Sequence, residues 1–154
     1  MKLILLSSAL ILGITGCAGI DGFRQGDVLV ETPWARATAG RTATGVVYVR
    51  LRNLGAAPER LISIATPVAA EAAVHETTRE QGMMSMRRVN SVELPADGVV
   101  LLKPGGLHIM LMRLRAPLEE GETFPMTLTF KRAGPVTIQV EVRDLGAISP
   151  HAHE

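Results

Sequence analysis

The segment Val136-Thr137-Ile138-Gln139-Val140-Glu141-Val142-Arg143 decides the fold class, because apolar and polar side chains alternate along it without a break. Alternation with period two places the apolar side chains on one face of a β-strand and the polar side chains on the other. The same alternation recurs in residues 126–131 and 45–53. We therefore predict that these three segments are half-buried strands.

Six further short segments are also predicted to be strands. They cover residues 28–36, 60–65, 71–76, 84–89, 98–102 and 107–114. Turn-forming clusters such as Asn53-Leu54-Gly55 and Lys103-Pro104-Gly105-Gly106 separate them, and no long helical stripe competes. About nine short strands at this spacing predict an all-β fold, a single-domain antiparallel Greek-key β-sandwich. Its core is expected to be aliphatic, because aromatic residues make up only 3% of the chain.

The composition fits one such domain and excludes several classes of protein. The chain has 154 residues, of which 47% are hydrophobic and 20% charged, so it is not of the disordered type. A formal net charge of +1 argues against nucleic acid as the main partner. The single cysteine excludes an intramolecular disulfide, a zinc ribbon, a CxxC redox site and a cysteine-ligated iron–sulfur cluster.

The N-terminus has the pattern of a targeting segment. Met1-Lys2 precedes a mostly apolar run, Leu3 to Ile14, which is typical of a secretory signal peptide and too short for a bilayer that needs about 20 residues. Ile14-Thr15-Gly16-Cys17 then resembles a bacterial lipobox, whose cysteine is lipidated. We predict a lipoprotein with a signal peptide at 1–16, a lipidated Cys17 with a tether at 17–27, the β-sandwich at 28–144, and a flexible tail at 145–154.

Histidine and methionine gather in two segments of the predicted sandwich. In His108-Ile109-Met110-Leu111-Met112, the period of a strand puts His108, Met110 and Met112 on one face. The second segment holds His75, Met83, Met84 and Met86. Imidazole and thioether together form a soft, neutral ligand set that suits Cu(I), whereas calcium and magnesium require carboxylates. Each residue alone is more typical of ordinary packing, and only the combination favours a metal site.

The spacing of four of these residues is specific. His75, Met86, His108 and Met110 are separated by ten, twenty-one and one residues, which resembles the H-x10-M-x21-H-x-M motif of the periplasmic copper chaperone family PCuAC. The flanking stretches Pro33-Trp34-Ala35-Arg36-Ala37, Gly45-Val46-Val47-Tyr48-Val49 and Leu102-Lys103-Pro104-Gly105-Gly106-Leu107 resemble the family as well. The resemblance covers roughly residues 28–143. One departure is Thr77, where many members carry methionine.

This resemblance implies a cupredoxin-like β-sandwich that is not an enzyme and that carries Cu(I) in the periplasm. It implies His75, Met86, His108 and Met110 as the Cu(I) ligands, with Met83, Met84 and Met112 as secondary candidates. The usual recipient in the family is the apo CuA domain of cytochrome c oxidase, sometimes with a Sco-type thiol protein. Ala18 after the lipobox cysteine favours the outer membrane over the inner one, by resemblance to lipoprotein sorting.

Several interpretations stay open at this point. The protein could deliver copper for cytochrome c oxidase assembly, buffer periplasmic copper for tolerance, or be a metal-free adhesive or assembly β-sandwich. Arg87 is a candidate for supporting the ligands or docking the recipient, with a purely structural role equally open. The C-terminal His151 and His153 are either a weak Cu(II) or Zn(II) site or two chance histidines in a disordered end. No paired carboxylates or Ser/His/Asp arrangement favours an enzyme.

Overall fold

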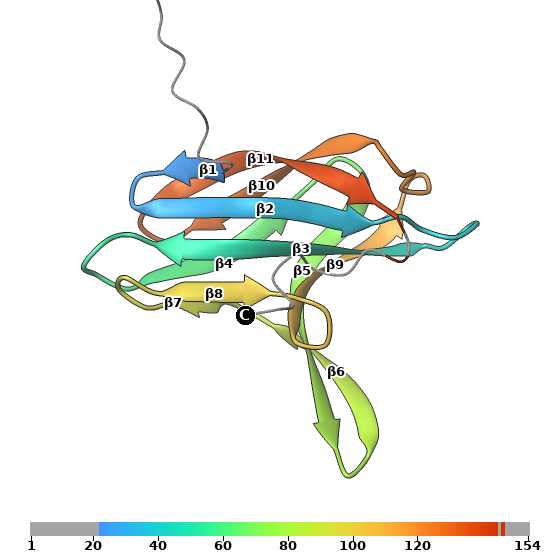
Figure 1. Ribbon diagram of the computed structural model, residues 1–154, viewed down its shortest axis with the longest axis horizontal. Helices are drawn as coiled ribbons and strands as arrows, with labels where there is room; N and C mark the ends of the chain where they lie inside the picture. Colours follow the sequence, from blue (N-terminus) through green and yellow to red (C-terminus); the bar gives the residue numbers. More distant parts are fainter. Residues whose placement is uncertain (1–21, 145, 147–154) are drawn as a thin grey trace, which may run out of the picture.

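The computed structural model describes residues 22–144 and 146, and its regular elements in that range are all β-strands (Figure 1). They are β1 Gly22–Gln25, β2 Val28–Arg36, β3 Thr44–Asn53, β4 Glu59–Ala65, β5 Ala69–Glu80, β6 Met83–Val89, β7 Val92–Leu94, β8 Val99–Leu102, β9 Leu107–Leu114, β10 Thr123–Phe130 and β11 Gly134–Arg143. Within these residues, no helix is long and apolar enough to cross a membrane. The all-β prediction is confirmed, and each predicted strand overlaps an observed one.

The strands form one continuous sheet in the order β6-β5-β9-β3-β2-β11-β10-β4-β7, with β1 paired to β2 and β8 paired to β3. One pairing departs from the predicted antiparallel arrangement, because Trp34–Arg36 of β2 run parallel to Glu141–Arg143 of β11. The register of β2 shifts between Glu31 and Trp34. This irregularity divides β2, so that β1 pairs with its first half and β11 with its second half.

The core lies between the inward faces of this curled sheet and is mainly aliphatic, as predicted. In β11 the alternating residues Val136, Ile138, Val140 and Val142 are all buried. Met126 of β10 lies opposite Ile138 and is fully buried, so this methionine belongs to the core. Burying each such side chain contributes about 1.5–3 kcal/mol, which makes the core the rigid support for the remaining strands.

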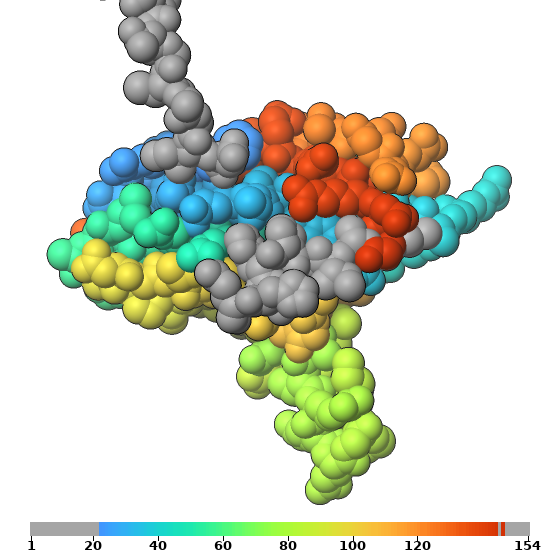
Figure 2. All heavy atoms as spheres, in the orientation of Figure 1, coloured from blue at the N-terminus to red at the C-terminus, as the bar shows by residue number. Residues whose placement is uncertain are grey.

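The β5–β6 hairpin projects from the body and is the most prominent feature of the outline (Figures 1 and 2). Its ladder joins residues 74–80 of β5 to residues 83–89 of β6. The loop between them is only Gln81 and Gly82, whose φ angles of 51° and 82° fit a two-residue hairpin turn. The hairpin therefore carries Met83, Met84 and Met86 away from the core.

One predicted boundary differs in the structure. Residues 22–25 lie inside the tether expected at 17–27, but they form β1. Phe23 pairs with Val30 of β2 and packs against the core, which explains why this stretch is ordered into a strand. The predicted signal peptide, Cys17, His151 and His153 lie outside the described residues.

Candidate metal centre

His75 and His108 are brought together by the pairing of β5 with β9. They lie directly opposite each other in the antiparallel register. Their ring centroids are 6.3 Å apart and the ring planes differ by 27°. Side chains at opposed positions lie on the same face of a sheet, so both imidazoles are within reach of one metal ion.

His108 offers the stronger evidence that this pair fits a metal. Its Nδ1 lies 3.0 Å from the carbonyl oxygen of Gly106. A carbonyl only accepts hydrogen bonds, so Nδ1 is the donor in this contact, and in the neutral imidazole Nε2 then keeps its lone pair. Nε2 is buried and has no hydrogen-bond partner. An unsatisfied buried nitrogen is destabilising, and metal-binding histidines commonly donate their other N–H to a backbone carbonyl. These features suit Nε2 of His108 to bind a metal.

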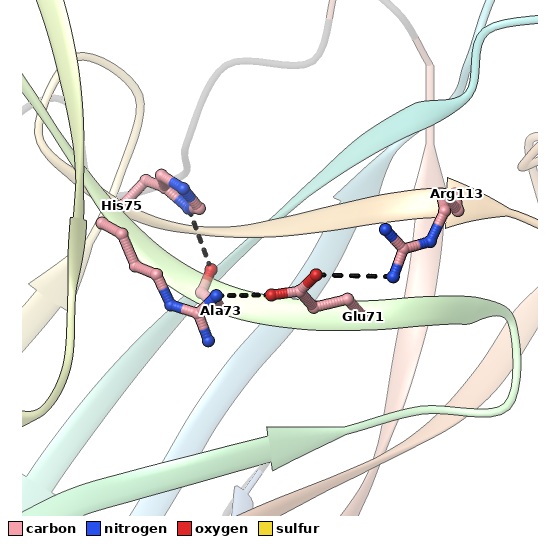
Figure 3. A network of polar contacts seen from close by, with 5 residues as sticks. Glu71, Ala73, His75 and Arg113 are labelled. Atoms are coloured by element: carbon pink, nitrogen blue, oxygen red, sulfur yellow. Dashed lines mark hydrogen bonds and ion pairs between the residues drawn. The ribbon is translucent and has the colours of Figure 1, made fainter.

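His75 shows a weaker form of the same arrangement. Its Nδ1 lies 3.4 Å from the carbonyl oxygen of Ala73, as Figure 3 shows. The side chain is half-buried, whereas His108 is only 4% exposed. The pair therefore consists of one imidazole fixed inside the sheet and one nearer the solvent.

The register also places methionines on the face that carries the two histidines, here called the site face. It comprises positions 71, 73, 75, 77 and 79 of β5, positions 84, 86 and 88 of β6, and positions 108, 110 and 112 of β9. Met110 lies opposite Ala73, two residues along β9 from His108, and Met86 lies opposite Thr77 on the hairpin. All four predicted ligands thus share one face over three adjacent strands.

The secondary candidates are spread more widely. Met112 lies on the site face opposite Glu71, at the end away from the hairpin. Met84 shares the face with Met86 but lies nearer the hairpin tip and is 64% exposed. Met83 pairs with Glu80, so strand alternation turns it to the opposite face. Met83 is therefore separated from the predicted ligands.

The arginines of β6 divide between the two faces of the hairpin. Arg87 points to the face opposite the ligands, where its Nε and Nη2 donate to Oε2 of Glu76 at 3.0 and 2.7 Å. This contact gives Arg87 a structural role in joining β5 to β6. Arg88 lies on the site face opposite His75 and forms an ion pair with Glu71. Sequence reasoning missed Arg88, although the alternation around Met86 is the signal that identifies it.

The resulting site is chemically soft and open on one side. Two imidazoles and the thioether of Met110 come from the sheet, and the thioether of Met86 comes from the projecting hairpin. Met86 is 52% exposed, in contrast to His108. Such a donor set suits Cu(I), which prefers thioether and imidazole ligands over carboxylates.

The fold and the candidate site together place the chain among PCuAC domains. The chain has the fold of PCuAC domains, so the resemblance to this family is confirmed. The copper-bound PCuAC domain of PmoF2 superposes with a TM-score of 0.70 at 27% identity, covering 80% of this chain and 97% of that domain. The Cu(I) form of DR1885 from Deinococcus radiodurans gives a TM-score of 0.62 at 28% identity, covering 82% and 83%.

The family follows from the sequence comparison. Residues 28–142 match the family described as "Putative lipoprotein LpqE-like", and the chain belongs to this family. A protein of Leifsonia xyli subsp. xyli named "Putative lipoprotein" is 32% identical over 89% of this chain and 86% of its own length. An uncharacterized protein of Rickettsia prowazekii is 30% identical over 64% of this chain and 56% of its own length.

Proposed function

We propose that this protein is an extracytoplasmic Cu(I) chaperone whose ligands are His75, Met86, His108 and Met110. The observation that carries the proposal is the buried, unpartnered Nε2 of His108, which lies across the strand pair from His75. The similarity to PCuAC domains described as copper-bound supports the same metal. The cargo is then a monovalent soft ion, which thioether sulfur favours.

The division between buried and exposed donors supports a carrier that both holds and releases its ion. His108 and Met110 belong to a strand that is packed on both edges, by β3 and β5. Met86 belongs to a hairpin strand at the end of the sheet. A recipient that approaches from the hairpin side meets the most accessible ligand first. Displacement of Met86 would then open the coordination sphere without disturbing the core.

The proposed setting is the periplasm, with the domain anchored through lipidated Cys17 and with the outer membrane favoured. The lipobox pattern and the lipoprotein names in the family support this setting. The oxidising periplasm suits ligands that cannot form disulfides. The proposed recipient is the apo CuA domain of cytochrome c oxidase, directly or with a Sco-type protein. His151 and His153 are proposed as a separate weak Cu(II) site on the tail.

Binding and transfer test this proposal separately. The mature chain is expected to bind one Cu(I) at the site against a competing chelator, and the His75→Ala/Met86→Ala/His108→Ala/Met110→Ala variant is expected to lose that binding. Equal affinity of the two proteins would contradict the ligand assignment. Cu(I)-loaded protein should then transfer its ion to an apo CuA domain. Tight binding without transfer, together with copper sensitivity of a deletion strain, would instead indicate a copper buffer.

A further inference from the structure

A charged cluster adjoins the proposed ligands on the site face. Glu71 of β5 pairs with Arg88 of β6 through Oε1 and with Arg113 of β9 through Oε2, the second contact at 3.5 Å. Figure 3 shows this carboxylate with an ion pair at each oxygen and with His75 above the same strand. We call Glu71, Arg88 and Arg113 the ion triad.

The triad lies close to the proposed ligands in the strand register. Glu71 is opposite Met112, two residues along β9 from Met110. Arg88 is opposite His75, and its guanidinium reaches back along β5 to Glu71. The intervening position on the site face is Ala73, whose small side chain leaves room for that path. The triad therefore borders the histidine pair on the side away from the hairpin tip.

The contacts of Glu71 have a chemical consequence. Among the site-face positions of the described strands, Glu71 is the only carboxylate. Each of its oxygens is engaged by an arginine, and its side chain is 31% exposed. A free carboxylate beside two imidazoles would add a hard, anionic donor that stabilises divalent ions. The arginines keep this oxygen donor occupied, so the ligand set stays neutral.

The net charge of the ion triad also disfavours a divalent ion relative to a monovalent one. One carboxylate and two guanidiniums sum to a formal charge of +1. Repulsion between this charge and a bound ion scales with the charge of the ion, so it opposes Cu(II) twice as strongly as Cu(I). The backbone of Arg113 has φ 54°, a conformation that is unusual for a side chain of this size. Its guanidinium nevertheless reaches Glu71, which completes the triad.

We propose that the ion triad is the specificity determinant that favours monovalent over divalent ions at the metal centre. This inference rests on the proposed Cu(I) function and adds residues that do not touch the metal. We take a unit charge about 7 Å from the bound ion, which is the length of two residues along a strand. Coulomb's law in a medium like bulk water then gives about a threefold effect on the affinity for a monovalent ion. The corresponding factor for a divalent ion is the square, about ninefold.

The test compares Arg88→Gln with Arg87→Gln in the mature chain. The two variants remove the same charge from adjacent residues, but Arg87 lies on the opposite face and contacts Glu76. Affinities for Cu(I), measured without oxygen, and for Cu(II) are determined with competing chelators. Arg88→Gln is expected to raise Cu(I) affinity about threefold and Cu(II) affinity about ninefold or more. Arg87→Gln is expected to change the ratio of the two affinities less, because its charge lies on the far face of the hairpin.

Two further measurements make the outcome decisive. Glu71→Gln raises the charge of the triad, so Cu(II) affinity should fall about ninefold and Cu(I) affinity about threefold. These shifts should shrink in 1 M salt, where the screening length is about 3 Å. Equal ratios for Arg88→Gln and Arg87→Gln, or shifts that persist unchanged in 1 M salt, would overturn the triad proposal. Absence of tight Cu(I) binding by the unsubstituted protein would instead refute the proposed function.

Discussion

Replacing His108 with leucine is predicted to remove copper binding while leaving the metal-free domain as stable as before. A buried residue normally supports the fold, and its replacement usually lowers the free energy of unfolding. His108 differs because it is 4% exposed and its Nε2 has no partner. Leucine is similar in size and has no polar atom to leave unsatisfied.

The expected magnitude follows from two opposing contributions. Removing the unsatisfied Nε2 stabilises the metal-free protein by about 1–3 kcal/mol. Losing the 3.0 Å bond from Nδ1 to the carbonyl of Gly106 destabilises it by about 0.5–1.5 kcal/mol. The net change in the free energy of unfolding therefore lies between about −0.5 and +2.5 kcal/mol, where a positive value favours the variant. A gain of 1 kcal/mol would raise Tm by about 3–6 °C for a domain of this size.

Denaturant unfolding with and without Cu(I) is the appropriate assay. The unsubstituted protein should gain stability with Cu(I), because an ion that binds only the folded state raises the free energy of unfolding. His108→Leu should gain little. The control is Leu111→Ala, which is fully buried on the same strand: it should lose about 2–5 kcal/mol yet keep the copper-dependent gain. A His108→Leu variant destabilised by more than 2 kcal/mol, or one that keeps the full gain, would refute the reasoning.

Three further predictions concern other parts of the chain. Burial alone would raise the pKa of Glu59, but hydrogen bonds from the backbone amides of Arg60, Arg132 and Ala133 lower this pKa overall. The carboxylate therefore stabilises the fold above its unfolded pKa of about 4.3, and this contribution is lost as pH falls through the lower pKa of the folded state. Glu59→Gln should consequently flatten the acid limb of a curve of unfolding free energy against pH. Gly82 has φ 82° with open space around it, so Gly82→Ala should strain the turn by about 1 kcal/mol and speed amide exchange in the hairpin but not in β10. Met126 is fully buried in the core, so Met126→Ala should cost about 2–5 kcal/mol by thermal unfolding and leave Cu(I) affinity unchanged, since this methionine is not on the site face.

Strand alternation predicted the parts of the fold that have one buried and one exposed face. Residues 136–143 form β11 with the predicted side buried, and the same rule placed His108, Met110 and Met112 together. It failed where both faces meet solvent or where a strand is very short. Residues 77–80 of β5 lie in the projecting hairpin and show no apolar period, and β7 has only three residues. The parallel pairing of β2 with β11 depends on the irregularity inside β2, which no local pattern reveals.

The shared face of the candidate ligands was predictable to a similar extent, for a different reason. The spacing of His75, Met86, His108 and Met110 resembled a family motif, and the pairing of β5 with β6 and β9 explains how such long gaps converge on one face. The ion pairs of Glu71 could not be predicted, because its partners come from β6 and β9 and depend on the register. Arg88 lies two residues from Met86 and shares its face by strand alternation, whereas the predicted candidate Arg87 lies on the other face.

X-ray absorption of the Cu(I)-loaded mature chain tests the central claim most directly, because the fine structure at the copper edge reports the atoms bound to the ion. Two nitrogen and two sulfur scatterers are expected, from the imidazoles of His75 and His108 and the thioethers of Met86 and Met110. A Met86→Ala/Met110→Ala variant should lose the sulfur contribution and keep the nitrogen contribution. A spectrum with no sulfur scatterers in the unsubstituted protein, or one that the double substitution leaves unchanged, would contradict the account.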